Sequence, residues 1–197
     1  MKELYCLSIK LFHRLIEARE WNVYGIPANY AVISILTPKK VGEYWKHPLT
    51  DANGTVLNLD FSDLEVDDFM KVFSEKREDL ELRINYNHTH VVNERGVVEA
   101  ELLSKRDAER LYDFIVANSD KNIVVHCEGG ASRSVAVAKF ILENFDGYKL
   151  TDRDIKPETM DRAANTWVLY LLKKIKAQRD YSQKEKIMLT TSSKDLL

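Results

Sequence analysis

Cysteine is nearly absent from this chain, which has only Cys6 and Cys127 among its 197 residues. Two cysteines are too few for a disulfide framework, and they are typical of the reduced thiols of an intracellular protein. The chain also lacks an apolar run long enough to cross a membrane, and its first residues lack an apolar stretch of signal-peptide length. The sequence therefore predicts a cytoplasmic protein that does not enter a membrane.

An excess of charge is missing as well, because the formal net charge is −2. This balance gives no reason to expect nucleic acid or a membrane surface as a partner. The hydrophobic content of 45% and the charged content of 30% are ordinary for a globular protein. We expect one domain over residues 1–178, followed by a polar, flexible tail over residues 179–197. The composition gives no indication of the oligomeric state.

Two kinds of segment, which differ in the spacing of their apolar residues, alternate along the chain. Short β-branched runs predict strands, and apolar residues at helical spacing predict helices. Their alternation predicts an α/β fold: a single domain with a mostly parallel central sheet flanked by helices on both faces. Residues 75–96 break the pattern, with only a weak signal for a strand pair within 81–92. The expected strands lie near 3–9, 30–36, 55–61 and 123–125, and the expected helices near 11–21, from 67, at 104–118, at 135–145 and after 157.

The most informative stretch runs from Asn122 to Ser134. It begins as a short apolar strand, turns through Gly129 and Gly130, and becomes a nearly all-apolar helix after Arg133. Glycine permits left-handed or crowded backbone angles that other residues avoid. A strand, a glycine turn and a helix N-terminus direct several backbone N–H groups towards one anion. In a parallel sheet this turn lies at the carboxyl edge, where ligands bind.

A cysteine opens this turn and an arginine closes it. Only the thiolate of Cys127 is a good nucleophile, and a free thiol with a pKa of about 8.5 is mostly protonated at neutral pH. The loop amides, the helix N-terminus and Arg133 all favour the thiolate. Arg133 offers a planar fork that can hold two phosphate oxygens. We expect Ser134 to donate its hydroxyl to the departing thiolate, and His126 to orient the loop through ring hydrogen bonds.

The sequence His126-Cys127-x5-Arg133-Ser134 resembles the signature of the cysteine-dependent protein tyrosine and dual-specificity phosphatases, especially the compact bacterial or phage-like members. The resemblance implies a phosphocysteine intermediate on Cys127, with Arg133 binding the phosphoryl group. It implies a phosphorylated protein carrying phosphotyrosine as the substrate, and it leaves open whether phosphoserine and phosphothreonine are substrates too. It calls for no cofactor and no metal. The residues between the cysteine and the arginine would form the phosphate cradle: Glu128, Gly129, Gly130, Ala131 and Ser132.

The family also uses an aspartate on a separate loop to protonate the leaving group. Asp63 is our first choice, because it ends a strand in a segment that resembles the acid-bearing loop of the family. Asp60 is second, followed by Asp67 and Asp68. An acid must reach the leaving oxygen within hydrogen-bond distance, so sequence spacing does not decide among them. The alternative role for Asp63 is a helix cap or a solvated loop carboxylate.

Several other functions remain open. The same loop could act on an RNA 5′-triphosphate or a phosphoinositide, but the cradle has no lysine or arginine to hold further phosphates. It could also bind phosphorylated partners without turnover. A sulfurtransferase ranks last, because its loop usually lacks the closing arginine. A structural role for Cys127 as a small buried side chain is the simplest alternative. His88 and His90 alternate as metal ligands can, yet no further ligands complete a site.

Overall fold

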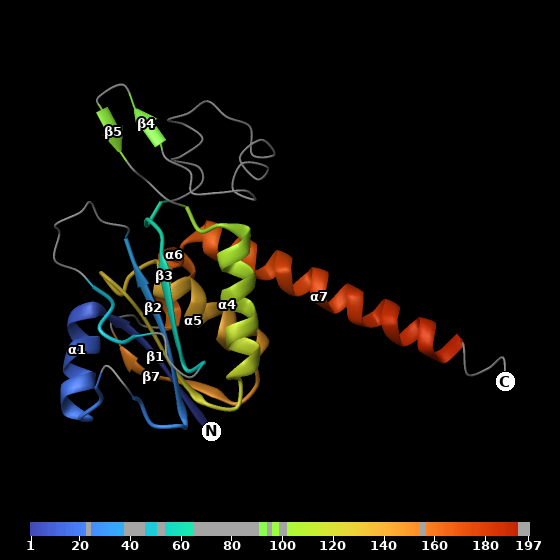
Figure 1. The fold of residues 1–197 in the computed structure, drawn as a ribbon, viewed down its shortest axis with the longest axis horizontal. Coiled ribbons are helices and arrows are strands. Elements are labelled where there is room, and N and C mark those ends of the chain that lie inside the picture. The colour runs from blue at the N-terminus through green and yellow to red at the C-terminus, as the bar shows by residue number, and fades with distance from the viewer. Residues whose placement is uncertain are drawn as a thin grey trace.

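A five-stranded parallel sheet forms the centre of the protein (Figure 1). The computed structural model describes residues 1–22, 25–37, 46–50, 54–64, 91–93, 96–98, 102–153 and 157–192. All neighbouring strands of the sheet pair in parallel, in the order β3-β2-β6-β1-β7. The predicted α/β fold is therefore confirmed. The strands are β1 (Lys2–Ser8), β2 (Tyr30–Leu36), β3 (Val56–Asp60), β6 (Asn122–Cys127) and β7 (Tyr148–Arg153).

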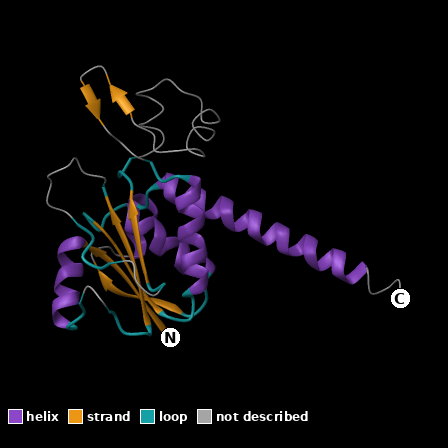
Figure 2. Ribbon diagram, viewed as in Figure 1, coloured by secondary structure: helices purple, strands orange, loops and turns teal. Residues whose placement is uncertain are grey.

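Helices cover both faces of the sheet (Figure 2). Successive side chains of a strand point to opposite faces, so each buried strand contributes to two cores. On one face the strands pack against α4 (Lys105–Ala117), α5 (Arg133–Asn144) and α7 (Thr166–Ser192). On the other face they pack against α1 (Ile9–Ala18). This double burial explains why β2 and β6 are apolar almost throughout.

The carboxyl ends of the strands meet at one edge. Cys127, the last residue of β6, lies opposite Ser8 at the end of β1. On its other side β6 pairs with β2, and the end of β2, Leu36, lies opposite Asp60 at the end of β3. Because β6 is the middle strand, Cys127 occupies the centre of this edge. The loops that follow β2, β3 and β6 can therefore converge on it.

Local signals fix the ends of the helices. Ser104 begins α4: its hydroxyl accepts a hydrogen bond from the Asp107 N–H and donates one to the Asp107 carboxylate. The first of these bonds is the one that an N-cap serine makes with the third residue of its helix. Ser8 caps α1 by accepting from the Leu11 N–H. Gly147, with φ +83°, lies in the turn between α5 and β7, in the backbone region that favours glycine.

Two elements differ from the sequence-based expectation. Strand β7 was not expected, because its sequence, Tyr-Lys-Leu-Thr-Asp-Arg, is mostly polar; it is an edge strand that pairs only with β1. Helix α7 continues to Ser192, so residues 179–192 are helical where we expected a flexible tail. Among the residues of α7 whose side chains are described, the last buried one is Ile175, and residues 176–185 are half-buried or exposed.

The remaining elements are short. A two-stranded antiparallel sheet joins β4 (Val91–Asn93) and β5 (Gly96–Val98), slightly further along the chain than the strand pair suggested by the sequence. A 3-10 turn (Pro157–Thr159) and α6 (Met160–Ala163) precede α7. The helix expected from residue 67 lies outside the described residues. None of the helices within them has the length and apolarity needed to cross a membrane.

Candidate active site

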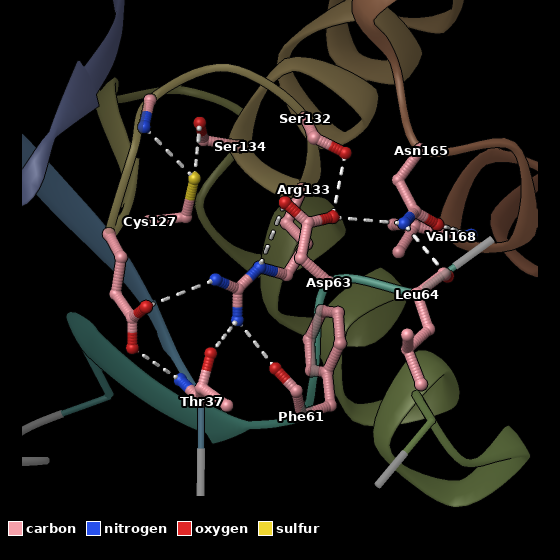
Figure 3. Close-up of polar contacts among 12 residues, drawn as sticks. Thr37, Phe61, Asp63, Leu64, Cys127, Ser132, Arg133, Ser134, Asn165 and Val168 are labelled. Atoms are coloured by element: carbon pink, nitrogen blue, oxygen red, sulfur yellow. Dashed lines mark hydrogen bonds and ion pairs between the residues drawn. The ribbon is translucent and has the colours of Figure 1, made fainter. Parts of the chain in front are cut away.

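The loop after β6 surrounds the sulfur of Cys127 with hydrogen bond donors (Figure 3). The N–H of Gly130 donates to Cys127 Sγ at 3.2 Å, and Ser134 Oγ lies 3.2 Å from the same sulfur. The Cys127 side chain is buried, and so is Ser134, at the start of α5. Both donors can stabilise a negative charge on sulfur. The expected contact between Ser134 and the sulfur is therefore present.

Backbone groups of the loop are left open for an anion. Gly130 has φ +69°, in the region that favours glycine, whereas a Cβ on Gly129 would meet no atom within 4 Å. The side chain of Ser132, which precedes α5, makes no capping bond to the helix. Among the described residues, the N–H groups of Gly129 and Ala131 have no hydrogen bond partner. The loop and the helix N-terminus thus retain free N–H donors.

The guanidinium of Arg133 is held in place from several sides. Its Nη1 donates to Thr37 Oγ1 at 3.1 Å and to the Phe61 carbonyl at 2.6 Å. Its Nη2 lies 3.8 Å from Glu128 Oε2. The side chain is only 3% exposed, yet within the described part of the chain Nε has no hydrogen bond partner. A buried N–H of a charged group without an acceptor is costly, so this donor is available for an anionic ligand.

Asp63 lies against the loop on its exposed side. Its Oδ1 accepts a hydrogen bond from Ser132 Oγ at 2.7 Å and another from Asn165 Nδ2 at 3.1 Å. Its Oδ2 lies 3.8 Å from Arg133 Nε. The Asp63 side chain is 38% exposed, so solvent and a ligand can reach it. The structure thus brings our first candidate for the acid next to the arginine.

The other candidate acids are placed differently. Asp60 pairs with His47, with Oδ1 3.0 Å from Nε2, and His47 Nδ1 in turn lies 2.7 Å from Ser34 Oγ. This chain of contacts looks like a Ser-His-Asp triad, but Ser34 is fully buried and cannot meet a substrate. Asp67 and Asp68 lie outside the described residues. Asp63 is therefore the better placed of the two described candidates.

His126 points away from the loop that it was expected to orient. Its ring stacks on Phe12 of α1, with centroids 4.0 Å apart, on the opposite face of the sheet from Cys127. The described residues offer neither ring nitrogen a hydrogen bond partner. Burial, together with the electrostatic influence of His47 and His13, lowers the pKa of His126 from 6.5 to about 3. The imidazole is thus neutral and packs as an aromatic core residue.

Three contributions to the site were not predicted from the sequence. Thr37 and the Phe61 carbonyl hold Arg133, and Thr37 N–H also donates to Glu128 Oε1 at 3.0 Å. Asn165 joins Asp63 to α7, because its Oδ1 accepts from the Val168 N–H and caps the helix. A polar residue at a strand end and an asparagine ahead of an apolar helix were the only available signals. The partners of these residues are distant in sequence.

The chain was compared with protein-family models, with characterised proteins and with solved structures, and none of them matches it. No group of three or more histidine, cysteine or acidic side chains that could hold a metal ion occurs in the part of the chain that the structure describes.

Proposed function

We propose that the protein is a cysteine-dependent phosphatase that hydrolyses phosphate monoesters. One observation carries this proposal. A buried cysteine sulfur shares one loop with backbone N–H groups and a buried arginine N–H that have no hydrogen bond partner among the described residues. Sulfur is a nucleophile, and the free donors fit the oxygens of a phosphoryl group. The resemblance of the loop to the phosphatase signature agrees with this assignment.

In the first half of the reaction, the thiolate of Cys127 attacks phosphorus. The bond between phosphorus and the ester oxygen breaks, and the electron pair leaves with that oxygen. Asp63 is our candidate for the acid that gives the oxygen its proton, becoming a carboxylate. Arg133 Nε and the loop N–H groups stabilise the charge on the phosphoryl oxygens. The products are an alcohol or phenol and a phosphocysteine.

In the second half, water hydrolyses the phosphocysteine. The Asp63 carboxylate accepts a proton from the water as its oxygen attacks phosphorus. The bond between phosphorus and sulfur breaks, and the thiolate leaves with the electron pair. Ser134 Oγ, 3.2 Å from the sulfur, donates to the departing thiolate. Inorganic phosphate is released, and both Cys127 and Asp63 return to their starting states.

The charges around Arg133 favour a single phosphoryl group. The carboxylates of Asp63 and Glu128 each lie 3.8 Å from the guanidinium, on Nε and Nη2. A second phosphate near this pair would be repelled. We therefore place phosphotyrosine in proteins first, with phosphoserine and phosphothreonine next. RNA 5′-triphosphates and phosphoinositides follow. Both cysteines are free thiols, which agrees with the cytoplasmic location we propose.

Hydrolysis of p-nitrophenyl phosphate tests the proposal. Purified protein in EDTA and reductant should release p-nitrophenol, and a Cys127→Ser variant should release none above background. Phosphopeptides, a 5′-triphosphorylated RNA and phosphoinositide vesicles, compared side by side, would rank the substrate classes. Phosphopeptide binding by a wild-type protein that releases no phosphate would instead support a binding module. Full activity of Cys127→Ser would exclude the proposed nucleophile.

A further inference from the structure

Asp63 is unusual in that its two carboxylate oxygens have different surroundings (Figure 3). Oδ1 accepts two hydrogen bonds, one from Ser132 Oγ at 2.7 Å and one from Asn165 Nδ2 at 3.1 Å. Oδ2 accepts none among the described residues and lies 3.8 Å from Arg133 Nε. A carboxylate oxygen has two lone pairs in its plane, and on Oδ1 both of them are engaged.

This asymmetry decides where a proton can sit. A proton on Oδ1 would displace one of its two donors, whereas a proton on Oδ2 would leave both hydrogen bonds intact. Oδ2 is also the oxygen that faces Arg133, the group assigned to the phosphoryl oxygens. We propose that Ser132 and Asn165 are positioning residues that place the transferable proton of Asp63 on Oδ2, facing the leaving group. This inference rests on the phosphatase function proposed above.

Asn165 is itself held by several hydrogen bonds. Its Nδ2 donates to the Leu64 carbonyl as well as to Asp63, both at 3.1 Å. Its Oδ1 accepts from the Val168 N–H, and its own N–H donates to the Ser132 carbonyl at 3.3 Å. The residue is 1% exposed. A buried amide with fixed partners cannot rotate freely, so it holds the loop of Asp63 against the phosphate loop.

Leaving-group chemistry distinguishes positioning from a purely structural role. The p-nitrophenolate anion is stable and needs little protonation, whereas phenolate is a stronger base and needs the acid. A change that misdirects the Asp63 proton should therefore slow phenyl phosphate hydrolysis more than p-nitrophenyl phosphate hydrolysis. A change that only loosens the fold should slow both equally. The ratio of kcat/KM for the two substrates is the quantity to measure.

Two variants fit this test. Ser132→Ala removes one donor to Asp63 and sacrifices no helix cap, because the Ser132 side chain caps nothing in α5. Asn165→Ser keeps a good N-cap for α7 while removing the amide that reaches Asp63 and Leu64. Asn118→Ser is the matched control. Asn118 is also buried and donates through Nδ2 to two carbonyls, those of Gly54 and Phe114.

We expect each positioning variant to reduce the phenyl phosphate rate about tenfold more than the p-nitrophenyl phosphate rate, a part of the roughly 100-fold or larger effect of a general acid. The control should leave the ratio unchanged. In an Asp63→Asn background, neither Ser132→Ala nor Asn165→Ser should change the ratio further. If Asn165→Ser does not fold, Ser132→Ala alone decides.

Equal losses on both substrates, or an altered ratio that persists in the Asp63→Asn background, would overturn the positioning role. A failure of the proposed phosphatase function would give different results. If that function were wrong, the wild-type protein would hydrolyse neither substrate, or Cys127→Ser would be as active as the wild type.

Discussion

At the scale of single residues, His126 and Cys127 show how neighbours in sequence acquire different roles. Alternation along β6 sends Cys127 to the face covered by α5 and His126 to the face covered by α1. The cysteine meets hydrogen bond donors, and the histidine meets an aromatic ring. The pair is adjacent in the motif, but the structure gives His126 a packing role on the opposite face of the sheet from Cys127.

The buried state of His126 predicts a pH-dependent stability. Its pKa falls from 6.5 to about 3, chiefly because burial disfavours the charged ring. Below pH 6.5 the unfolded chain therefore binds a proton that the folded protein does not. Stability should fall as the pH drops from about 6.5 towards 3, with His126 contributing about 1.4 kcal/mol per pH unit. Above pH 6.5, His126 makes no contribution to the pH dependence of stability.

Urea unfolding of the wild type and of His126→Asn across this range checks the prediction. Other groups titrate in both proteins, so the difference between the two slopes is the informative quantity. The variant should be less stable at neutral pH, because it loses the stacking on Phe12, and should lose less stability on acidification. Parallel curves for the two proteins would show that His126 takes up its proton in the folded state.

At the scale of elements, the loop between β6 and α5 needs only one of its two glycines for its backbone. Gly130 has φ +69°, whereas Gly129 lies outside the positive region and has open space around its Cβ position. The positive φ of Gly130 allows its own N–H to point at the sulfur of Cys127. The sequence indicated both glycines equally, because a residue pattern does not reveal φ.

The two glycines form a matched pair of test sites. Gly130→Ala should destabilise the protein by about 1–2 kcal/mol, the cost of a left-handed residue with a side chain. Gly129→Ala should change the free energy of unfolding by less than about 0.5 kcal/mol. Chemical denaturation of both variants measures the difference. Equal effects at the two positions would contradict the backbone assignment.

The sequence predicted well those elements whose apolar residues or capping residues mark them locally. The strand through Ile123, Val124 and Val125 is apolar because helices cover it on both faces, and Ser104 marks the start of α4 by its own capping bonds. Strand β7 was missed because an edge strand does not need an apolar sequence. Helix α7 was cut short because residues 176–185, which are half-buried or exposed, have no apolar stripe to detect.

The candidate site was predictable to a smaller extent. Cys127 and Arg133 stand out through their spacing, and Asp63 through its place after a strand. Thr37 and Asn165 could not be assigned, because their contacts with Arg133 and Asp63 span 96 and 102 residues. Such contacts follow from the strand order, which no local pattern encodes.

At the scale of the whole molecule, the sheet and its helices form the folded unit, and the end of α7 extends away from it (Figure 1). Among the residues of α7 whose burial is described, the last buried one is Ile175. Beyond it, Arg179 meets Asp113 at 3.3 Å in a solvent-exposed ion pair, which contributes little stability. The described buried residues of α7 thus lie between Trp167 and Ile175.

A chain that stops after Gln178 should retain the cooperative unfolding transition. We expect its Tm to lie within about 3 °C of the full chain, because less than about 1 kcal/mol is lost. The helical signal in circular dichroism should decrease in proportion to the helical residues that are removed, residues 179–192 of α7. A chain of residues 1–178 that no longer unfolds cooperatively would show that residues 179–197 belong to the folded core.

The central claim is that Cys127 forms a covalent bond to phosphorus, and mass spectrometry of rapidly quenched protein tests it most directly. Ser134→Ala should slow thiolate departure and let the intermediate accumulate during reaction with p-nitrophenyl phosphate. We expect a mass increase of one phosphoryl group located on the peptide that contains Cys127, and none in Cys127→Ser. Turnover without such an adduct, or an adduct on another residue, would contradict it.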